Sequence, residues 1–217
     1  MRYICAVFEG LIVTIAFYGI IYYLSKKGKL NIPCDGFWMQ KRSVWIWGLV
    51  TFCCTCGISA FRWIEMPIAL HVLSLFLVGG MAVLAETDFL QHWVPNRMLA
   101  GMLMLWALVV GVTIISDTQY GMELLGRGLI GGIASGLIFL LCYILSKRQL
   151  GAGDVKLAFI MGLYMTGQRI MGGIVYGTLL CFLYSIIQLV RKKLTVKDQV
   201  PLVPFLYGGV LITYFIL

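Results

Sequence analysis

The chain has 217 residues, of which 61% are apolar and only 12% are charged. A soluble domain of this length carries about twice that share of charged residues, and the mean hydropathy of +0.94 leaves too little polar surface to face water. The net charge of +8 would indicate nucleic acid as a partner only in a polar, basic domain, and the sequence contains none, so soluble and nucleic-acid-binding proteins are both excluded.

Apolar runs of about 20 residues recur along the chain, each long enough to cross a bilayer core of roughly 30 Å as a helix. Because lipid contains no water to satisfy open backbone groups, we predict an all-α polytopic membrane protein with about eight transmembrane helices. The expected spans are residues 4–24, 43–61, 66–85, 98–115, 124–145, 155–166, 170–190 and 202–217.

Two of these spans differ from the others. The first is too long for the core of a signal peptide, lacks a small-residue cleavage site and is followed by Lys26 and Lys27, so we expect it to be retained. The sixth covers only about 18 Å at 1.5 Å per residue. It can cross the membrane only if Asp154, which precedes it, is recessed or if water thins the bilayer there.

The basic residues predict which side of the membrane each loop occupies. If the loop at residues 25–42 is cytosolic, alternation of the spans places thirteen of the 17 Lys and Arg residues in the cytosol. Only Arg2, Arg62, Arg127 and Arg169 then lie toward the outside. This bias follows the positive-inside rule, so we expect the N-terminus outside and the protein in the cell membrane.

The first of two aspartates at the ends of apolar runs is Asp88, in the segment Ala85-Glu86-Thr87-Asp88-Phe89. A carboxylate at the membrane is costly and therefore usually has a function. Pro95 ends the helical pattern, and Val94 before it favours extended geometry, so we expect Asp88 to begin a short bent element at the interface. The alternative is a solvated loop that joins spans three and four.

The second aspartate is Asp154, in the segment Gly151-Ala152-Gly153-Asp154-Val155-Lys156. The glycines permit unusual backbone angles and close approach of another chain. Asp154 starts a helix, whose dipole favours a carboxylate. Lys156 is two residues further on and points to another helix face, toward lipid phosphates or solvent. The alternative is a plain turn in which Asp154 caps the helix.

Together, the two aspartates predict more than either does alone. They are far apart in sequence, yet both fall at the cytosolic ends of predicted spans. Two carboxylates within a few ångströms cannot both ionise readily, so one retains a proton. The ionised member can take a proton from water while the protonated member hydrogen-bonds a peptide carbonyl, which is general acid–base catalysis.

These segments resemble those of the prepilin (type IV leader) peptidases, a family of GxGD aspartic peptidases. The resemblance covers residues 66–217. It is carried by three stretches, which are Asp88 with Pro95 and Asn96, Gly151 to Lys156, and Val200-Pro201-Leu202-Val203-Pro204-Phe205.

The resemblance implies an endopeptidase that removes the basic leader from prepilin or pseudopilin precursors at the cytosolic membrane face, with no cofactor. Asp88 and Asp154 would be catalytic. The residues that bind substrate or shape the site would be Gly151, Gly153, Lys156, Pro95, Asn96, Pro201 and Pro204. Residues 1–65 would form separate N-terminal helices, and residues 66–217 would form the peptidase core.

The sequence also departs from the family pattern. Many relatives have a larger first cytosolic loop with two CxxC pairs and also N-methylate their product, whereas residues 25–42 contain only Cys34. One thiol cannot build a four-cysteine zinc site, so we expect neither a metal site nor methyltransferase activity. Many relatives carry an acidic residue at the position of Leu90 and a glycine at the position of Val203.

Other polar residues receive less specific interpretations. Glu86 is expected to reach water at the interface, the alternative being that it tunes the two aspartates or lies beside the substrate. His92 is expected to bond to a headgroup or loop, the alternative being a proton shuttle, and His71 to be packed with one hydrogen bond. Glu9 could face the bundle, pair with a basic group or lie near the outer surface. Alternative functions are a proton-coupled transporter, although paired repeats are not evident, and a non-catalytic scaffold of a pilus or secretion assembly.

Overall fold

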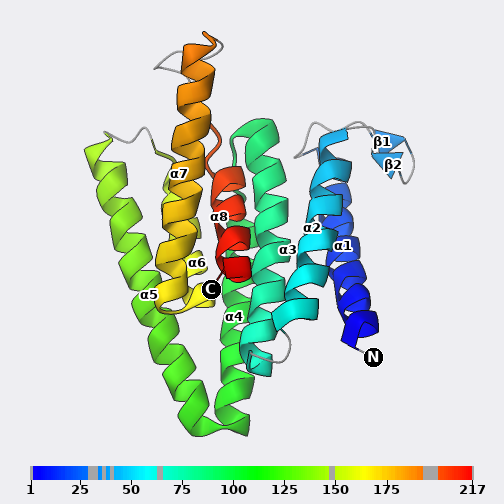
Figure 1. Ribbon diagram of the computed structural model, residues 1–217, viewed down its shortest axis with the longest axis vertical. Helices are drawn as coiled ribbons and strands as arrows, with labels where there is room; N and C mark the ends of the chain where they lie inside the picture. The colour runs from blue at the N-terminus through cyan, green and yellow to red at the C-terminus, as the bar shows by residue number, and fades with distance from the viewer. Residues whose placement is uncertain are drawn as a thin grey trace.

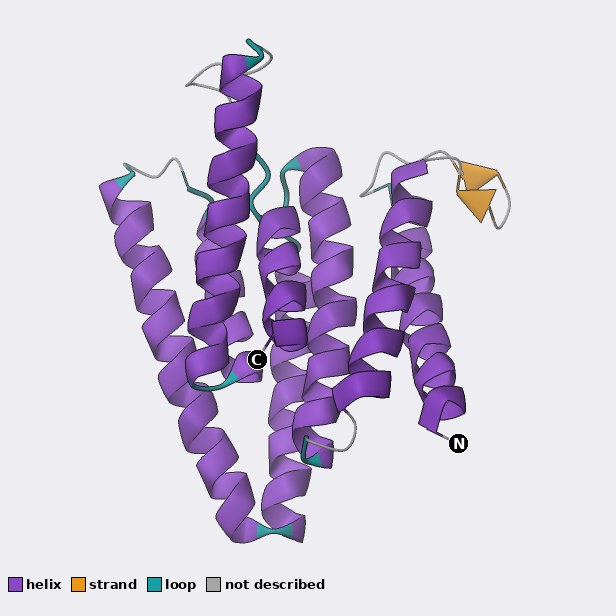
Figure 2. Ribbon diagram, in the orientation of Figure 1, coloured by secondary structure: helices purple, strands orange, loops and turns teal. Residues whose placement is uncertain are grey.

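The computed structural model describes residues 2–28, 34–35, 38–39, 42–62, 66–146, 150–192 and 200–216. These residues form a helical bundle (Figure 1), and a two-residue antiparallel strand pair follows the first helix (Figure 2). The elements are α1 (Arg2–Lys26), β1 (Cys34–Asp35), β2 (Trp38–Met39), α2 (Arg42–Arg62), α3 (Ile68–Gln91), α4 (Asn96–Ser116), α5 (Thr118–Leu145), α6 (Ala152–Met165), α7 (Gln168–Val190) and α8 (Val203–Ile216).

The lengths of these helices confirm a polytopic all-α membrane protein. Five of them, α1, α3, α4, α5 and α7, are long and apolar enough to cross a membrane. Shorter apolar helices occupy Val44–Ala60 within α2 and Val203–Ile216. Helix α6 has 14 residues and spans about 21 Å, which agrees with the short sixth element predicted from the sequence.

Successive helices run in opposite directions (Figure 1). Helices α3, α5 and α7 finish, and α4, α6 and α8 begin, at one end of the bundle, which we call the site end. The turn between α6 and α7 does not reach the other end of the bundle. In Figure 1 it lies near mid-height, whereas the turn between α4 and α5 lies at the bottom. Helix α7 starts from that turn and extends beyond the other helices at the site end.

Helix α3 is the central element of the bundle. Its apolar stretch is 61% buried, whereas the other four long helices are only 22–28% buried over theirs. Helices α1, α2, α4, α6 and α8 all contact it. The helix that carries Asp88 in its last turn is therefore held from several sides.

The contact between α5 and α6 depends on small residues. A Cβ atom on Gly131 would lie 2.6 Å from the carbonyl oxygen of Gly162, so a side chain there would force the two backbones apart. Ser135 reinforces this contact, because its hydroxyl donates to the carbonyl oxygen of Ala158 at 2.8 Å. This face of α5 therefore packs closely against α6, as small residues allow between membrane helices.

The structure corrects the predicted end of the third span. The helix continues past residue 85 to Gln91, so Asp88 lies within α3 and does not begin a separate bent element. Glu86, Thr87 and Asp88 are buried by neighbouring helices, which favours continued helical hydrogen bonding. The helix ends at His92, which adopts a left-handed conformation and donates its N–H to the Asp88 carbonyl at 2.8 Å.

Candidate active site

Four segments that are distant in sequence meet at the site end of the bundle. They are the last turn of α3, the segment that leads into α4, the first turn of α6 and the first turn of α8. These are the segments that the sequence motifs single out.

Asp88 comes from the last turn of α3 and is only 6% exposed. Its Oδ2 atom accepts a hydrogen bond of 3.0 Å from the backbone N–H of Val203, the first residue of α8. The first amides of a helix have no partners within the helix, and the helix dipole favours a negative charge at that end. Helix α8 therefore supplies a donor to the carboxylate of Asp88.

Asp154 comes from the first turn of α6, ahead of the apolar part of that helix. Burial, together with the nearby Asp88 carboxylate, raises the pKa of Asp154 to about 6, although the Gly151 N–H opposes this by donating to Oδ2 at 3.2 Å. The structure thus brings together the two aspartates, which we call the aspartate pair. Asp154 is the member for which a retained proton is favoured.

The glycines of the α6 segment lie in close contacts. A Cβ atom on Gly153 would lie 3.0 Å from Cβ of Val94, which belongs to the segment between α3 and α4. A Cβ atom on Gly151 would lie 3.0 Å from Oδ2 of Asp154. Gly153 thus allows the segment after Asp88 to approach the first turn of α6, and Gly151 leaves room for the Asp154 carboxylate.

Lys156 and Asn96 connect α6 to α4. The Lys156 Nζ atom donates to Oδ1 of Asn96 at 3.1 Å. Pro95, the N-cap residue of α4, is buried, and its carbonyl accepts the N–H groups of Met98 and Leu99 at 3.0 and 3.3 Å. Lys156 therefore points to a different face from Asp154, as the two-residue spacing predicts.

The two prolines near residue 200 determine where α8 begins. Pro204 is the second residue of the helix, where its missing N–H is tolerated, and Pro201 precedes the cap at Leu202. The Leu202 carbonyl accepts the N–H groups of Phe205 and Leu206, both at 3.1 Å. This start leaves the Val203 N–H free to reach Asp88, a contact that the sequence motifs do not predict because the donor is a backbone group.

In chemical terms, this arrangement is suited to general acid–base reactions. A carboxylic acid and a carboxylate that lie close together can donate to one reacting atom while accepting a proton from another. Comparison with known families gives an independent test of that reading. Residues 75–186, about half of the chain, match the sequence model of the type IV leader peptidase family.

The chain belongs to the type IV leader peptidase family. Comparisons with curated proteins and with solved structures give no significant match. The family identifies a multi-pass membrane peptidase and implies substrates of the prepilin type. The matched range includes both aspartates and the residues around them, while Pro201, Pro204 and helices α1 and α2 lie outside it.

Two polar residues near the aspartate pair occupy positions that differ in burial. Glu86 is fully buried within α3 of this leader peptidase, so the expectation that it reaches water is wrong. Its position in the central helix explains the difference, because neighbouring helices cover that turn on all sides. His92 is exposed at the end of α3.

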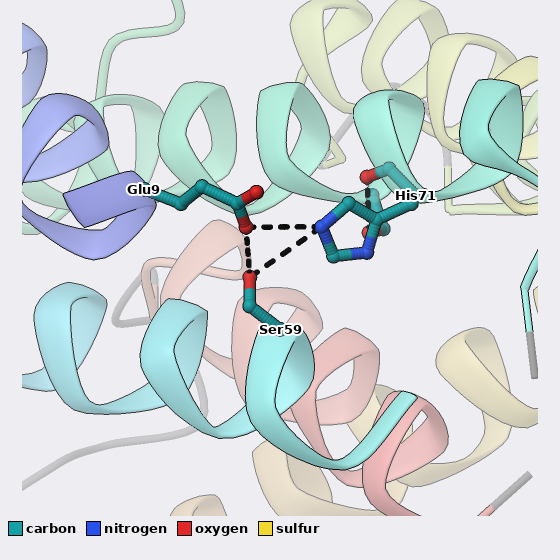
Figure 3. A network of polar contacts seen from close by, with 4 residues as sticks. Glu9, Ser59 and His71 are labelled. Atoms are coloured by element: carbon teal, nitrogen blue, oxygen red, sulfur yellow. Dashed lines mark hydrogen bonds and ion pairs between the residues drawn. The ribbon is translucent and has the colours of Figure 1, made fainter. Parts of the chain in front are cut away.

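A separate polar cluster joins α1, α2 and α3 at the end opposite to the aspartate pair (Figure 3). Oε2 of Glu9 lies 3.0 Å from Nε2 of His71 and accepts a 2.5 Å hydrogen bond from the Ser59 hydroxyl. His71 is only 3% exposed. Of the three possibilities for Glu9, the structure selects pairing with a histidine inside the bundle, and the packed position of His71 is confirmed.

The residues that could hold a metal ion are sparse in the described part of the chain. Over those residues, no three His, Cys, Asp or Glu side chains gather in a group that could bind one. Cys34 lies in β1, and its side chain is outside the described residues.

Proposed function

We propose that this leader peptidase is an aspartic endopeptidase that uses Asp88 and Asp154 to remove the basic leader from prepilin-like or pseudopilin-like precursors. The observation that carries the proposal is the meeting of two carboxylates from α3 and α6, close enough for the charge of one to raise the pKa of the other. No covalent intermediate is required, because a water molecule between the two groups can be the nucleophile.

The two aspartates take different roles in this proposal. Asp154 holds the shared proton and donates it toward the carbonyl oxygen of the scissile bond. Asp88, supported by the Val203 N–H, remains a carboxylate and accepts a proton from the attacking water. The pair titrates as a unit, so the protonation of one member always depends on the charge of the other.

The proposed substrate class follows from the family and from the crowded site. Gly151 and Gly153 sit in close contacts around Asp154, which leaves little room for a bulky side chain at the cut. A glycine before the scissile bond suits such a site. The apolar helix that follows the cut in a prepilin would lie in the bilayer beside the bundle.

We propose that the site end faces the cytosol and that the N-terminus lies outside the cell membrane. The distribution of basic residues supports this orientation, since Lys26 and Arg191 flank helices at the site end while Arg127 lies nearer the other end. The short segment between α1 and α2, which contains Cys34 as its only cysteine, supports a form without methyltransferase activity. The division into residues 1–65 and 66–217 is likewise a proposal.

Cleavage by purified protein tests the roles of the aspartates. The protein is reconstituted in vesicles with a prepilin-like precursor, and loss of the leader is followed by mass spectrometry. Asp88→Asn and Asp154→Asn should each reduce kcat by at least about a thousandfold, since each removes a group that the reaction needs in a defined protonation state.

The matched control is Asp117→Asn, the same chemical change at the opposite end of the bundle. Asp117 caps α5 by accepting the Tyr120 N–H at 3.0 Å, and asparagine serves equally well as a cap. This variant should retain full activity. Cleavage that survives either substitution in the aspartate pair would refute the proposed mechanism.

A further inference from the structure

A lateral groove lies on the face of α6 that is turned away from Asp154. It has a volume of about 600 Å³ and is formed by α4, α5 and α6. Its walls are apolar, with Leu103, Leu137 and Phe159 among the lining residues. A groove of this size falls within the range of small-ligand sites in proteins.

The polar groups of the groove are gathered at its site end. Among the described residues that line it, only Lys156 is charged, and Asn96 is the only other one with a polar side chain. The Lys156 ammonium has three donors, of which the bond to Asn96 Oδ1 uses one. The groove thus combines a cationic group at its site end, in the first turn of α6, with apolar walls along the rest of its length.

We propose that this groove binds an anionic phospholipid, with the phosphate on Lys156 and an acyl chain along α4, α5 and α6. Basic pockets between transmembrane helices are known to bind anionic headgroups. Within the described part of the chain, the lining has no carboxylate to pair with the amine of a zwitterionic headgroup, which favours a headgroup with net negative charge. The exposed apolar residues around the groove, such as Met104 and Leu141, face the surrounding lipid.

The substrate helix is a less suitable occupant of the groove. Lys156 is two residues from Asp154, about 200° around the helix, so the groove and the aspartate pair lie on opposite faces of α6. A substrate seated in the groove would have to pass over the first turn of α6, where the Lys156–Asn96 bond joins α6 to α4. A lipid has no such requirement, and in the groove it contacts the helix that carries Asp154.

Retention of lipid by the purified protein tests this site. The whole protein is titrated in detergent with phosphatidylglycerol or with phosphatidylcholine of the same chains, and bound lipid is counted by native mass spectrometry. The wild-type protein should bind one phosphatidylglycerol at least about tenfold more tightly than phosphatidylcholine. Lys156 can bond to the phosphate of either lipid, but the choline cation of phosphatidylcholine would lie beside the Lys156 ammonium with no carboxylate among the described lining residues to pair with it.

Two variants and their matched controls locate the bound lipid. Lys156→Gln removes the head contact and should weaken phosphatidylglycerol binding about tenfold, whereas Lys26→Gln removes a cation at the same end of the bundle and should not. Ala100→Phe fills the groove and should abolish tight binding. Met104→Phe adds the same side chain one turn further along α4, outside the groove lining, and should leave binding unchanged.

The result that overturns the proposal is equal retention of the two lipids, or wild-type affinity in Lys156→Gln. If Ala100→Phe does not fold, the charge variant alone still decides. A photo-crosslinking residue at position 100 identifies the occupant directly. Capture of the precursor's apolar helix in place of lipid would assign the groove to the substrate and refute a lipid site. The outcome is independent of whether Asp88 and Asp154 are catalytic.

Discussion

At the residue scale, Asp88 and Asp154 lie close together but have different hydrogen-bond partners. Asp88 receives a backbone donor from α8, whereas Asp154 is held by its own helix through the Gly151 N–H. Sequence spacing predicted that both residues belong to one end of the bundle. It could not predict their different partners, because Val203 reaches Asp88 only after two distant helices have packed together.

The raised pKa of Asp154 predicts how activity depends on pH. Below about pH 6 Asp154 carries its proton, and as pH rises through this value the proton is lost and both acids become charged. We therefore expect kcat/KM for precursor cleavage to fall on the alkaline side, with a limb within about one unit of pH 6. The measurement is cleavage rate against pH with stability checked at each point. Activity that instead rises steadily from pH 6 to alkaline values would contradict Asp154 as the proton donor.

The close contact between Gly153 and Val94 predicts that a side chain at position 153 slows cleavage. In Gly153→Ala the new Cβ would lie 3.0 Å from Cβ of Val94, so the first turn of α6 must move away by a few tenths of an ångström. Small displacements of catalytic groups slow reactions strongly, and we expect kcat to fall by at least about tenfold.

The control for this variant is Gly101→Ala in α4, because a Cβ at Gly101 meets nothing within 4 Å. It should keep normal activity. Adding Val94→Gly to Gly153→Ala removes the opposing Cβ and should restore part of the lost rate. If the double variant is no faster than Gly153→Ala alone, the contact does not set the position of Asp154.

At the element scale, the ends of helices were harder to predict than their existence. The apolar runs predicted eight helices in the right order, but α3 was expected to stop at residue 85 and instead continues to Gln91. Polar residues such as Glu86 and Asp88 interrupt the hydropathy signal without interrupting the helix, because neighbouring helices bury them. Conversely, α5 begins at Thr118, ahead of the apolar run, because Asp117 caps it.

The backbone N–H of Val203, at the start of α8, is predicted to contribute to the rate of cleavage independently of the Val203 side chain. Val203→Pro deletes the donor to Asp88 at the first helical position, where proline is tolerated. A hydrogen bond to a charged group contributes about 1.5–3 kcal/mol, so we expect kcat to fall about tenfold to a hundredfold, with a smaller change in KM. Val203→Ala keeps the N–H while shortening the buried side chain, and it should retain most of the activity. Equal losses in the two variants would assign the effect to packing.

At the scale of the whole molecule, alternation of the helices explains why residues far apart in sequence share one end. Four helices, α4 to α7, lie between the end of α3 and the start of α8, so the chain returns to the same end, and α6 preserves this alternation although it is short (Figure 1). The sequence could predict this arrangement from charge bias and span count. It could not predict the mid-height α6–α7 turn, because that turn depends on burial of α6 against α5 and on the positive φ angles of Thr166 and Gly167.

The proposed orientation predicts which positions a membrane-impermeant thiol reagent can reach in intact cells. In a variant whose seven cysteines are replaced, Asp117→Cys places a thiol in the exposed turn between α4 and α5, and Lys192→Cys places one in the exposed turn after α7. Because these turns lie at opposite ends of the bundle, we expect Asp117→Cys to be labelled in intact cells and Lys192→Cys only after lysis. A permeant reagent should label both and serves as the control. The reverse pattern would place the aspartate pair on the outer side of the membrane, where a cytosolic precursor could not meet it before export.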